Sequence, residues 1–194
     1  MRLRRFERFA AGCPRFWRVN WFEWLPAQIA SLAADHEAAA RHLRRLCDLL
    51  EEHDQRFYLS SAAPMLGREL CSLGHHDEAE RYARLGRELD VRQNALGEAL
   101  WRQVQALVHA NRGHYTEADA LAREAVALTE HMDGLNYQGE ALCDLAEVLH
   151  AAGRTEEAAA TLEQALERYE RKKNLAMVAQ VRARLESLAL PAGN

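Results

Sequence analysis

The chain has 194 residues, of which 48% are hydrophobic and 28% charged, and its formal net charge is −4 at pH 7. This composition excludes a disordered chain, and the negative balance gives no general attraction to nucleic acid or to anionic lipid. With only 10 glycines and 4 prolines, the chain has too few turn residues for an all-β fold, so an all-α fold is expected.

The N-terminal segment, 1–15, is basic, since arginine recurs along it while Glu7 is its single acid. Two interpretations stay open: an arm that binds phosphate groups, or a solvated terminus. No apolar run of signal-peptide length follows the arginines, and the longest uncharged stretch, 24–34, is too short to cross a bilayer. We therefore expect a cytoplasmic protein with no membrane contact and no nucleic-acid partner.

Four similar stretches begin at Ala34, Gly74, Gly113 and Gly153, so the sequence repeats at a nearly constant interval. Apolar residues recur at helical spacing on both sides of each of these positions, so each unit is predicted to be an antiparallel helix pair. The expected helices are 16–33, 35–52, 57–73, 76–90, 96–111, 115–131, 136–152, 155–171 and 175–189. They give one repeat domain over 1–194, with repeats at 16–53, 57–91, 96–132 and 136–172.

Two details of the repeats are predicted from side-chain size and from proline chemistry. Small residues at Ala39, Ala79, Ala118 and Ala158 recur where the two helices of a pair must approach closely. Pro64 would remove a hydrogen bond inside a helix, so one interpretation starts that helix later, with Ser60 or Ser61 as its N-cap.

The last helix, 175–189, has no second partner and is predicted to cap the stack. Its apolar face would consist of Leu175, Val178, Val181, Leu185 and Leu188, while Arg182, Arg184 and Glu186 would face water.

The repeats resemble tetratricopeptide repeats through their Gly-x-x-x-Glu-Ala core, although their period is longer than is usual for that family. Strings such as RFYLSSAAPMLGREL and NYQGEALCDLAEVL resemble the C-terminal MalT-like repeats of bacterial signal-transduction ATPase and cyclase regulators. The resemblance covers 21–194 and implies a right-handed superhelical solenoid of four helix pairs plus a capping helix. It also implies a bacterial, regulatory setting.

In such a stack the first helix of each pair lines the concave side, and its polar residues become candidates for partner binding. By helical phase, the candidates in this groove are Gln28, Arg68, Arg102, His109, Glu147 and His150. The third pair is an exception, because Trp101, Val104 and Val108 indicate a first helix rotated by one residue.

Three tryptophans near the N-terminus, Trp17, Trp21 and Trp24, share one helix face, and Phe22, Leu25 and Ile29 supply another. Two interpretations stay open: they cap the open end of the stack, or they form a docking face for a partner or for a second copy in a homodimer.

No enzyme, cofactor or metal site is expected. His75 and His76 are adjacent on a turn, and His109 and His114 have no acidic or cysteine ligand near them at helical spacing. Cys47, Cys71 and Cys143 lie on apolar helix faces, and no Gly-x-Ser-x-Gly motif is present.

Two functional hypotheses follow. The first is a protein–protein interaction scaffold that binds a peptide or a helical segment of a partner on its concave surface. The alternative is a ligand- or peptide-sensing module of a bacterial signalling or transcriptional regulator.

Overall fold

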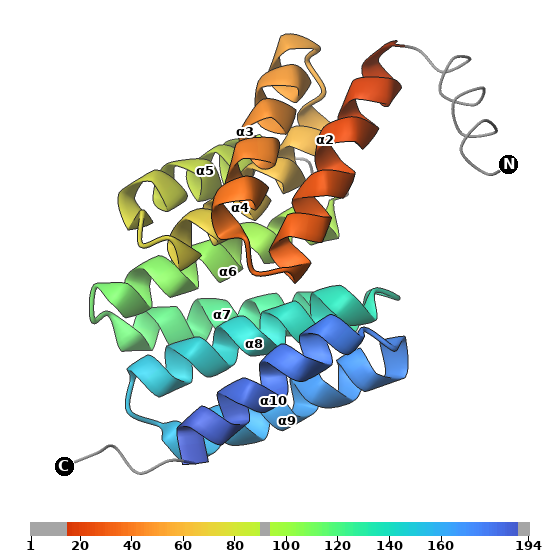
Figure 1. The fold of residues 1–194 in the computed structure, drawn as a ribbon. Helices are drawn as coiled ribbons and strands as arrows, with labels where there is room; N and C mark the ends of the chain where they lie inside the picture. Colours follow the sequence, from red (N-terminus) through yellow and green to blue (C-terminus); the bar gives the residue numbers. More distant parts are fainter. Residues whose placement is uncertain (1–14, 90–93, 190–194) are drawn as a thin grey trace, which may run out of the picture.

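The computed structural model describes residues 15–89 and 94–189, with side chains from Phe22 onward. Within these ranges the fold is entirely helical (Figure 1). Its nine helices are α2 (Arg15–Leu32), α3 (His36–Glu52), α4 (Arg56–Ser72), α5 (His76–Glu88), α6 (Ala95–Asn111), α7 (Tyr115–Glu130), α8 (Leu135–Ala151), α9 (Thr155–Lys172) and α10 (Leu175–Ala189). Each boundary lies within two residues of its predicted position. The basic N-terminal segment lies outside the described residues except for Arg15, where α2 begins.

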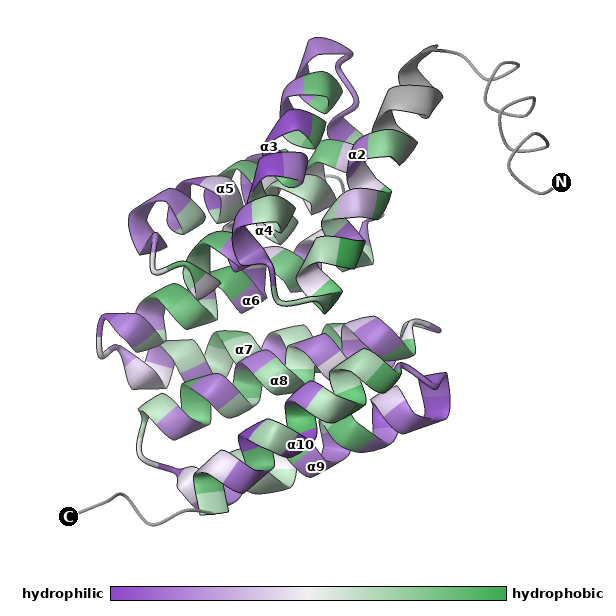
Figure 2. Ribbon diagram, viewed as in Figure 1, coloured by the Kyte–Doolittle hydropathy of each residue, from purple (hydrophilic) through white to green (hydrophobic). Residues whose placement is uncertain are grey.

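The helices form four antiparallel pairs that stack side by side, followed by α10, so the predicted solenoid is confirmed (Figure 1). Within the stack the first helices α4, α6 and α8 also contact one another, whereas the second helices lie on the outer side. Figure 2 agrees, because hydrophobic residues prevail along α6 and α8 and hydrophilic residues cover much of α3 and α5. A first helix is therefore buried on two sides and can turn only a narrow strip of residues toward the concave surface.

The small residues lie at the helix crossings as predicted. Ala39, Ala79, Ala118 and Ala158 are completely buried at the start of the second helix of each pair. Larger side chains there would separate the paired helices and lose their packing contacts.

The repeat phase is visible in the turns that join the paired helices. Gly74, Gly113 and Gly153 adopt φ values of 77°, 80° and 77°, a region that glycine enters without steric cost. Ala34 holds the equivalent position of the first pair with φ of 57°. The first pair therefore builds the same turn with a less suitable residue.

Both prolines of the described residues lie inside continuous helices, so the alternative start at Ser60 or Ser61 is wrong, while the start predicted at 57 lies one residue from that of α4. Helix α4 begins at Arg56 and contains Pro64, as α2 contains Pro26. The ring of Pro64 packs where a Cβ on Gly86 of α5 would stand, 2.4 Å from Pro64 Cγ. The neighbouring helix thus has a glycine where the ring needs space.

The last helix covers the end of the stack through only part of its predicted face. Val178 and Val181 are buried in the same core cluster as Leu162 and Tyr169, whereas Leu175 is 78% exposed, contrary to its predicted place on the covered face. Arg184 also differs from the prediction, because it turns toward the concave side and reaches α8. No helix in the described ranges is long and apolar enough to span a membrane.

Candidate functional site

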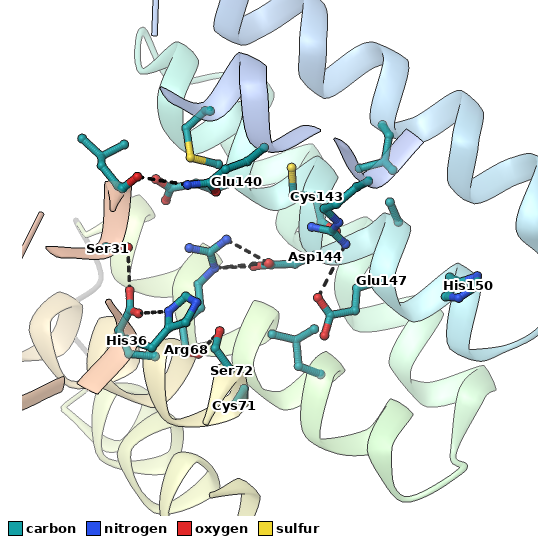
Figure 3. A pocket seen from close by; sticks show the side chains of 18 of the residues that line it. Ser31, His36, Arg68, Cys71, Ser72, Glu140, Cys143, Asp144, Glu147 and His150 are labelled. Carbon is teal, nitrogen blue, oxygen red and sulfur yellow. Dashed lines mark hydrogen bonds and ion pairs between the residues drawn. The ribbon is translucent and has the colours of Figure 1, made fainter. Parts of the chain in front are cut away.

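A cavity of about 390 Å³ lies on the concave side of the stack, between α2, α4, α8 and α10 (Figure 3). Most of its lining residues are polar, while Leu107, Leu162, Met177 and Leu188 add apolar patches. This volume lies within the range of small-molecule binding pockets. We call it the central cavity.

One face of α8 provides the longest polar wall of the central cavity. Glu140 is followed three and four residues later by Cys143 and Asp144, and then at intervals of three by Glu147 and His150, so all five lie along the same side of the helix (Figure 3). The buried opposite side, with Leu142, Leu145 and Leu149, anchors this face in the core.

Arg68 of α4 binds Asp144 of α8 across the cavity. Its Nε donates to Asp144 Oδ2 at 2.9 Å and its Nη2 donates to Oδ1 at 3.0 Å. Burial disfavours the charged form of Arg68, but the neighbouring Asp144 and Glu140 hold the pKa of its guanidinium well above the usual value. Because Asp144 is only 3% exposed, this bidentate ion pair joins the second and fourth helix pairs through a nearly dry contact.

A second polar cluster joins the ends of α2 and α4. Glu69, which is 5% exposed, accepts one hydrogen bond from Ser31 Oγ and another from His36 Nδ1, both at 2.7 Å. Its carboxylate is therefore satisfied by neighbours from the first helix pair (Figure 3).

Helix α10 closes the remaining side of the central cavity. Gln180 Nε2 donates to the carbonyl oxygen of Leu32 at 3.0 Å, so the last helix meets the end of the first described helix. Arg184 Nη2 lies 3.6 Å from Glu147 Oε2, a loose ion pair whose side chains are 40% and 59% exposed. The concave side is thus bounded from both ends of the stack.

Two acidic side chains of α8 carry raised pKa values. Burial raises the pKa of Glu140, and Arg68 offsets only part of this effect. The surrounding walls likewise raise the pKa of Glu147, although its side chain opens onto the cavity, and Asp144 raises it further. Glu140 makes no hydrogen bond or ion pair with any side chain of the described ranges.

The cysteines of the cavity wall are protonated at neutral pH. Burial raises the pKa of Cys71 to about 12 and that of Cys143 to about 11. A thiol in this state is a weak nucleophile and a weak metal ligand.

Four of the six predicted groove residues line the central cavity: Gln28, Arg68, Glu147 and His150. The other two, Arg102 and His109, do not line it. Arg102 stacks on the ring of Trp101 at 4.1 Å and binds Glu98 and Glu124, while His109 packs beside His114 with ring centroids 5.7 Å apart. Helix α6 buries Trp101, Val104 and Val108, which agrees with the rotated phase that these residues indicate.

Sequence analysis did not identify Glu69, Glu140, Asp144 or Arg184 as site residues. Glu140 and Asp144 carried a usable signal, because they precede Glu147 by seven and three residues and so share its helix face. Glu69 and Arg184 depend on how distant helices meet, and no local spacing indicates that.

The N-terminal aromatic residues are only partly described. Trp24 is half-buried against the core, and the side chains of Trp17 and Trp21 lie outside the described residues. Among the described side chains of α2, the exposed large apolar residues are Phe22, Leu25, Ile29 and Leu32, at 55%, 41%, 60% and 39% exposure. A docking or homodimer role for the tryptophan face stays a prediction.

The histidines do not gather into a metal centre within the part of the chain that the structure describes. No group of three histidine, cysteine, aspartate or glutamate side chains there is arranged to hold an ion. The Nδ1 atoms of His76 and His109 are buried without a hydrogen-bond partner.

Comparison with known families supports the repeat assignment. Residues 93–171 match the tetratricopeptide repeat family model. Among solved structures, BtubC (BKLC) from P. vanneervenii resembles the chain with a TM-score of 0.46 and 13% identity, over 94% of this chain and 96% of that one. No curated protein matches the chain. The third and fourth helix pairs thus carry the tetratricopeptide pattern in their sequence.

Proposed function

We propose that this chain is a non-catalytic binding module that holds an extended segment of a partner protein in the central cavity. Tetratricopeptide repeats generally mediate protein–protein interactions, and residues 93–171 match that family. The observation that carries the proposal is the convergence of polar side chains from α2, α4, α8 and α10 on one concave cavity.

The polar lining of the cavity favours an extended segment over a helical one. The backbone N–H and C=O groups of a helix are hydrogen-bonded within the helix, whereas those of an extended segment are free to bind side chains of the cavity. A few extended residues fit, and Gln28, Ser72 and Gln180 offer hydrogen-bonding groups to their backbone.

A sensing role is the second candidate, and the contact between α2 and α10 favours it. Because Gln180 of α10 binds the end of α2 across the cavity, a ligand that enters or leaves would alter how the two ends of the stack meet. The similarity of the sequence to MalT-like repeats of bacterial regulators points in the same direction. In that case the occupant is a small molecule or peptide and the response is a change of superhelical pitch.

A screen of a random library of pentapeptides with blocked termini tests peptide binding, with the cavity-blocking variant Gln28→Trp as comparison. Gln28 is half-buried at the cavity wall, so an indole there would occupy the site. Gln105→Trp is the matched control, since Gln105 is also half-buried but lines a separate depression beside Trp101.

We expect peptides that bind the wild type and Gln105→Trp but not Gln28→Trp. Binding that survives the blocking substitution, or no binding by the wild type, would contradict the proposal. A thermal-shift screen with metabolites tests the sensing role, and a ligand that protects the wild type but not Gln28→Trp would support it.

A further inference from the structure

The charges around the central cavity are unbalanced. Four carboxylates line it, Glu69, Glu140, Asp144 and Glu147, against only two guanidiniums, Arg68 and Arg184. Two histidines, His36 and His150, complete the titratable lining. The cavity is therefore acidic whenever the histidines are neutral.

Both guanidiniums already have partners inside the cavity. Arg68 is held by the two oxygens of Asp144, and Arg184 lies beside Glu147. An anionic ligand would have to displace these carboxylates, and Asp144, which is 3% exposed, would then be left buried and unpaired. The remaining carboxylate, that of Glu140, is the one without a partner among the described side chains.

Helix ends add to the negative potential. Ser31 and Leu32 occupy the last turn of α2, and Glu69 and Ser72 occupy the last turn of α4. Helix C-termini carry partial negative charge and favour cations nearby. The helix ends and the carboxylates thus both favour a positively charged ligand.

Tyr169 backs the wall that Glu140 and Cys143 form. Its side chain is completely buried and does not line the cavity. The ring end packs on Gly139, where a Cβ would stand 2.6 Å from Tyr169 Cζ. Because an uncharged phenol rather than a cation lies behind this wall, the carboxylate of Glu140 gains no ion pair from that side.

We propose that the central cavity binds a cationic nitrogen group, an ammonium or guanidinium, that forms an ion pair with the carboxylate of Glu140. The apolar patches formed by Leu107, Leu162, Met177 and Leu188 would pack against the aliphatic stem of such a group, as lysine and arginine stems do elsewhere. This inference rests on the proposed function, because it names the class of residue that a bound segment places in the cavity.

The test compares three pentapeptides with blocked termini that differ only in a central lysine, norleucine or glutamate, measured by NMR titration at low salt. Norleucine keeps the stem of lysine and removes its charge. We expect the lysine peptide to bind at least tenfold more tightly than the norleucine peptide, and the glutamate peptide to bind least. Spermidine is the probe for a free amine that is not part of a protein.

Glu140→Gln is the decisive variant, because it removes the charge and keeps the shape. We expect it to lower the affinity for the lysine peptide at least tenfold and to leave the norleucine peptide unchanged. Glu163→Gln, at an exposed position of α9 outside the cavity wall, is the matched control and should not change either affinity. A thermal melt of each variant shows whether it is folded.

The outcomes separate this inference from the function on which it rests. Equal binding of the lysine and norleucine peptides overturns the cation site and leaves peptide binding intact. Spermidine binding that depends on Glu140, without binding of any peptide, supports the cation site and overturns the peptide function. Loss of charge discrimination in Glu163→Gln as well as in Glu140→Gln also overturns the proposal, as does the absence of binding by every probe.

Discussion

Individual side chains in the central cavity differ in how their charges are compensated. Asp144 is compensated by a bidentate guanidinium, and Glu69 by a hydroxyl and an imidazole. Glu140 has only the more distant attraction of Arg68, which does not cancel the cost of burial. Charged groups that destabilise the folded state in this way commonly belong to binding sites, where a ligand supplies the missing partner.

Glu140→Gln should therefore stabilise the unliganded protein at neutral pH. The pKa of Glu140 is higher in the folded state than in the unfolded state, so the folded state binds the proton more tightly and stability from this group falls as pH rises through that interval. Below the ordinary pKa of glutamate both states are protonated, and the advantage of glutamine disappears.

Urea denaturation at pH 7 and at pH 4 measures the difference in the free energy of unfolding between the two proteins. Glu163→Gln should show no comparable stabilisation at pH 7. A Glu140→Gln protein that is less stable than the wild type at pH 7, or a difference that does not shrink in acid, would contradict this account.

How much of the site the sequence predicted depends on which helix carries each residue. Of the groove residues predicted from helical phase, four line the central cavity: Gln28, Arg68, Glu147 and His150. Arg102 and His109 lie outside it, because α6 is rotated so that it buries Trp101 between neighbouring helices. Partners such as Arg184 could not be predicted, since the contact needs the packing angle of α10.

The boundaries of the helices were predicted from the sequence more completely than the residues that line the central cavity. The regular repeat period, with turns at Gly74, Gly113 and Gly153, determines where each helix ends, because these positions need a positive φ. The alternative start at Ser60 or Ser61 assumed that Pro64 must lie in the first turn of its helix, whereas α4 begins at Arg56. Gly86 of α5 leaves space for the proline ring. Because Gly86 belongs to another helix, the local sequence around Pro64 does not indicate this space.

The first turn offers a stability test of the repeat phase. Ala34 holds φ of 57° where the other three pairs have glycine, and a side chain in this region costs about 1–2 kcal/mol. Ala34→Gly should raise the free energy of unfolding by about 0.5–1 kcal/mol, net of the extra entropy that glycine gains on unfolding.

Gly74→Ala is the reciprocal control. A Cβ at Gly74 meets nothing within 4 Å, so only the backbone conformation opposes it, and the variant should be destabilised by about 1 kcal/mol. Chemical denaturation of both variants measures the effect. A destabilised Ala34→Gly protein would show that the first pair is not equivalent to the others.

At the scale of the whole molecule, α10 both covers the core and bounds the binding side. Val178 and Val181 anchor it to the fourth pair, and Gln180 and Arg184, on the same helix, face the central cavity. The packing of α10 against the fourth pair therefore affects both the stability of the stack and the shape of the cavity.

Replacing Val178 and Val181 with alanine should lower the free energy of unfolding by about 3 kcal/mol, from lost burial and the space left behind. Leu175→Ala on the same helix is the control, because Leu175 is 78% exposed and should cost little. The double variant should also weaken peptide binding, measured by the same titration. Unchanged stability of the double variant would show that α10 does not cap the stack.

The hydrogen bond between Gln180 and Leu32 joins residues 148 positions apart in a fold whose other contacts are mostly between neighbouring repeats. In an open repeat array, the two terminal units unfold locally and independently of each other, so their amide hydrogens exchange at unrelated rates. Here the two ends touch, so loosening of either one removes a neighbour from the other. Amide exchange in α2 and α10 should therefore rise and fall together, although almost the entire described chain separates them.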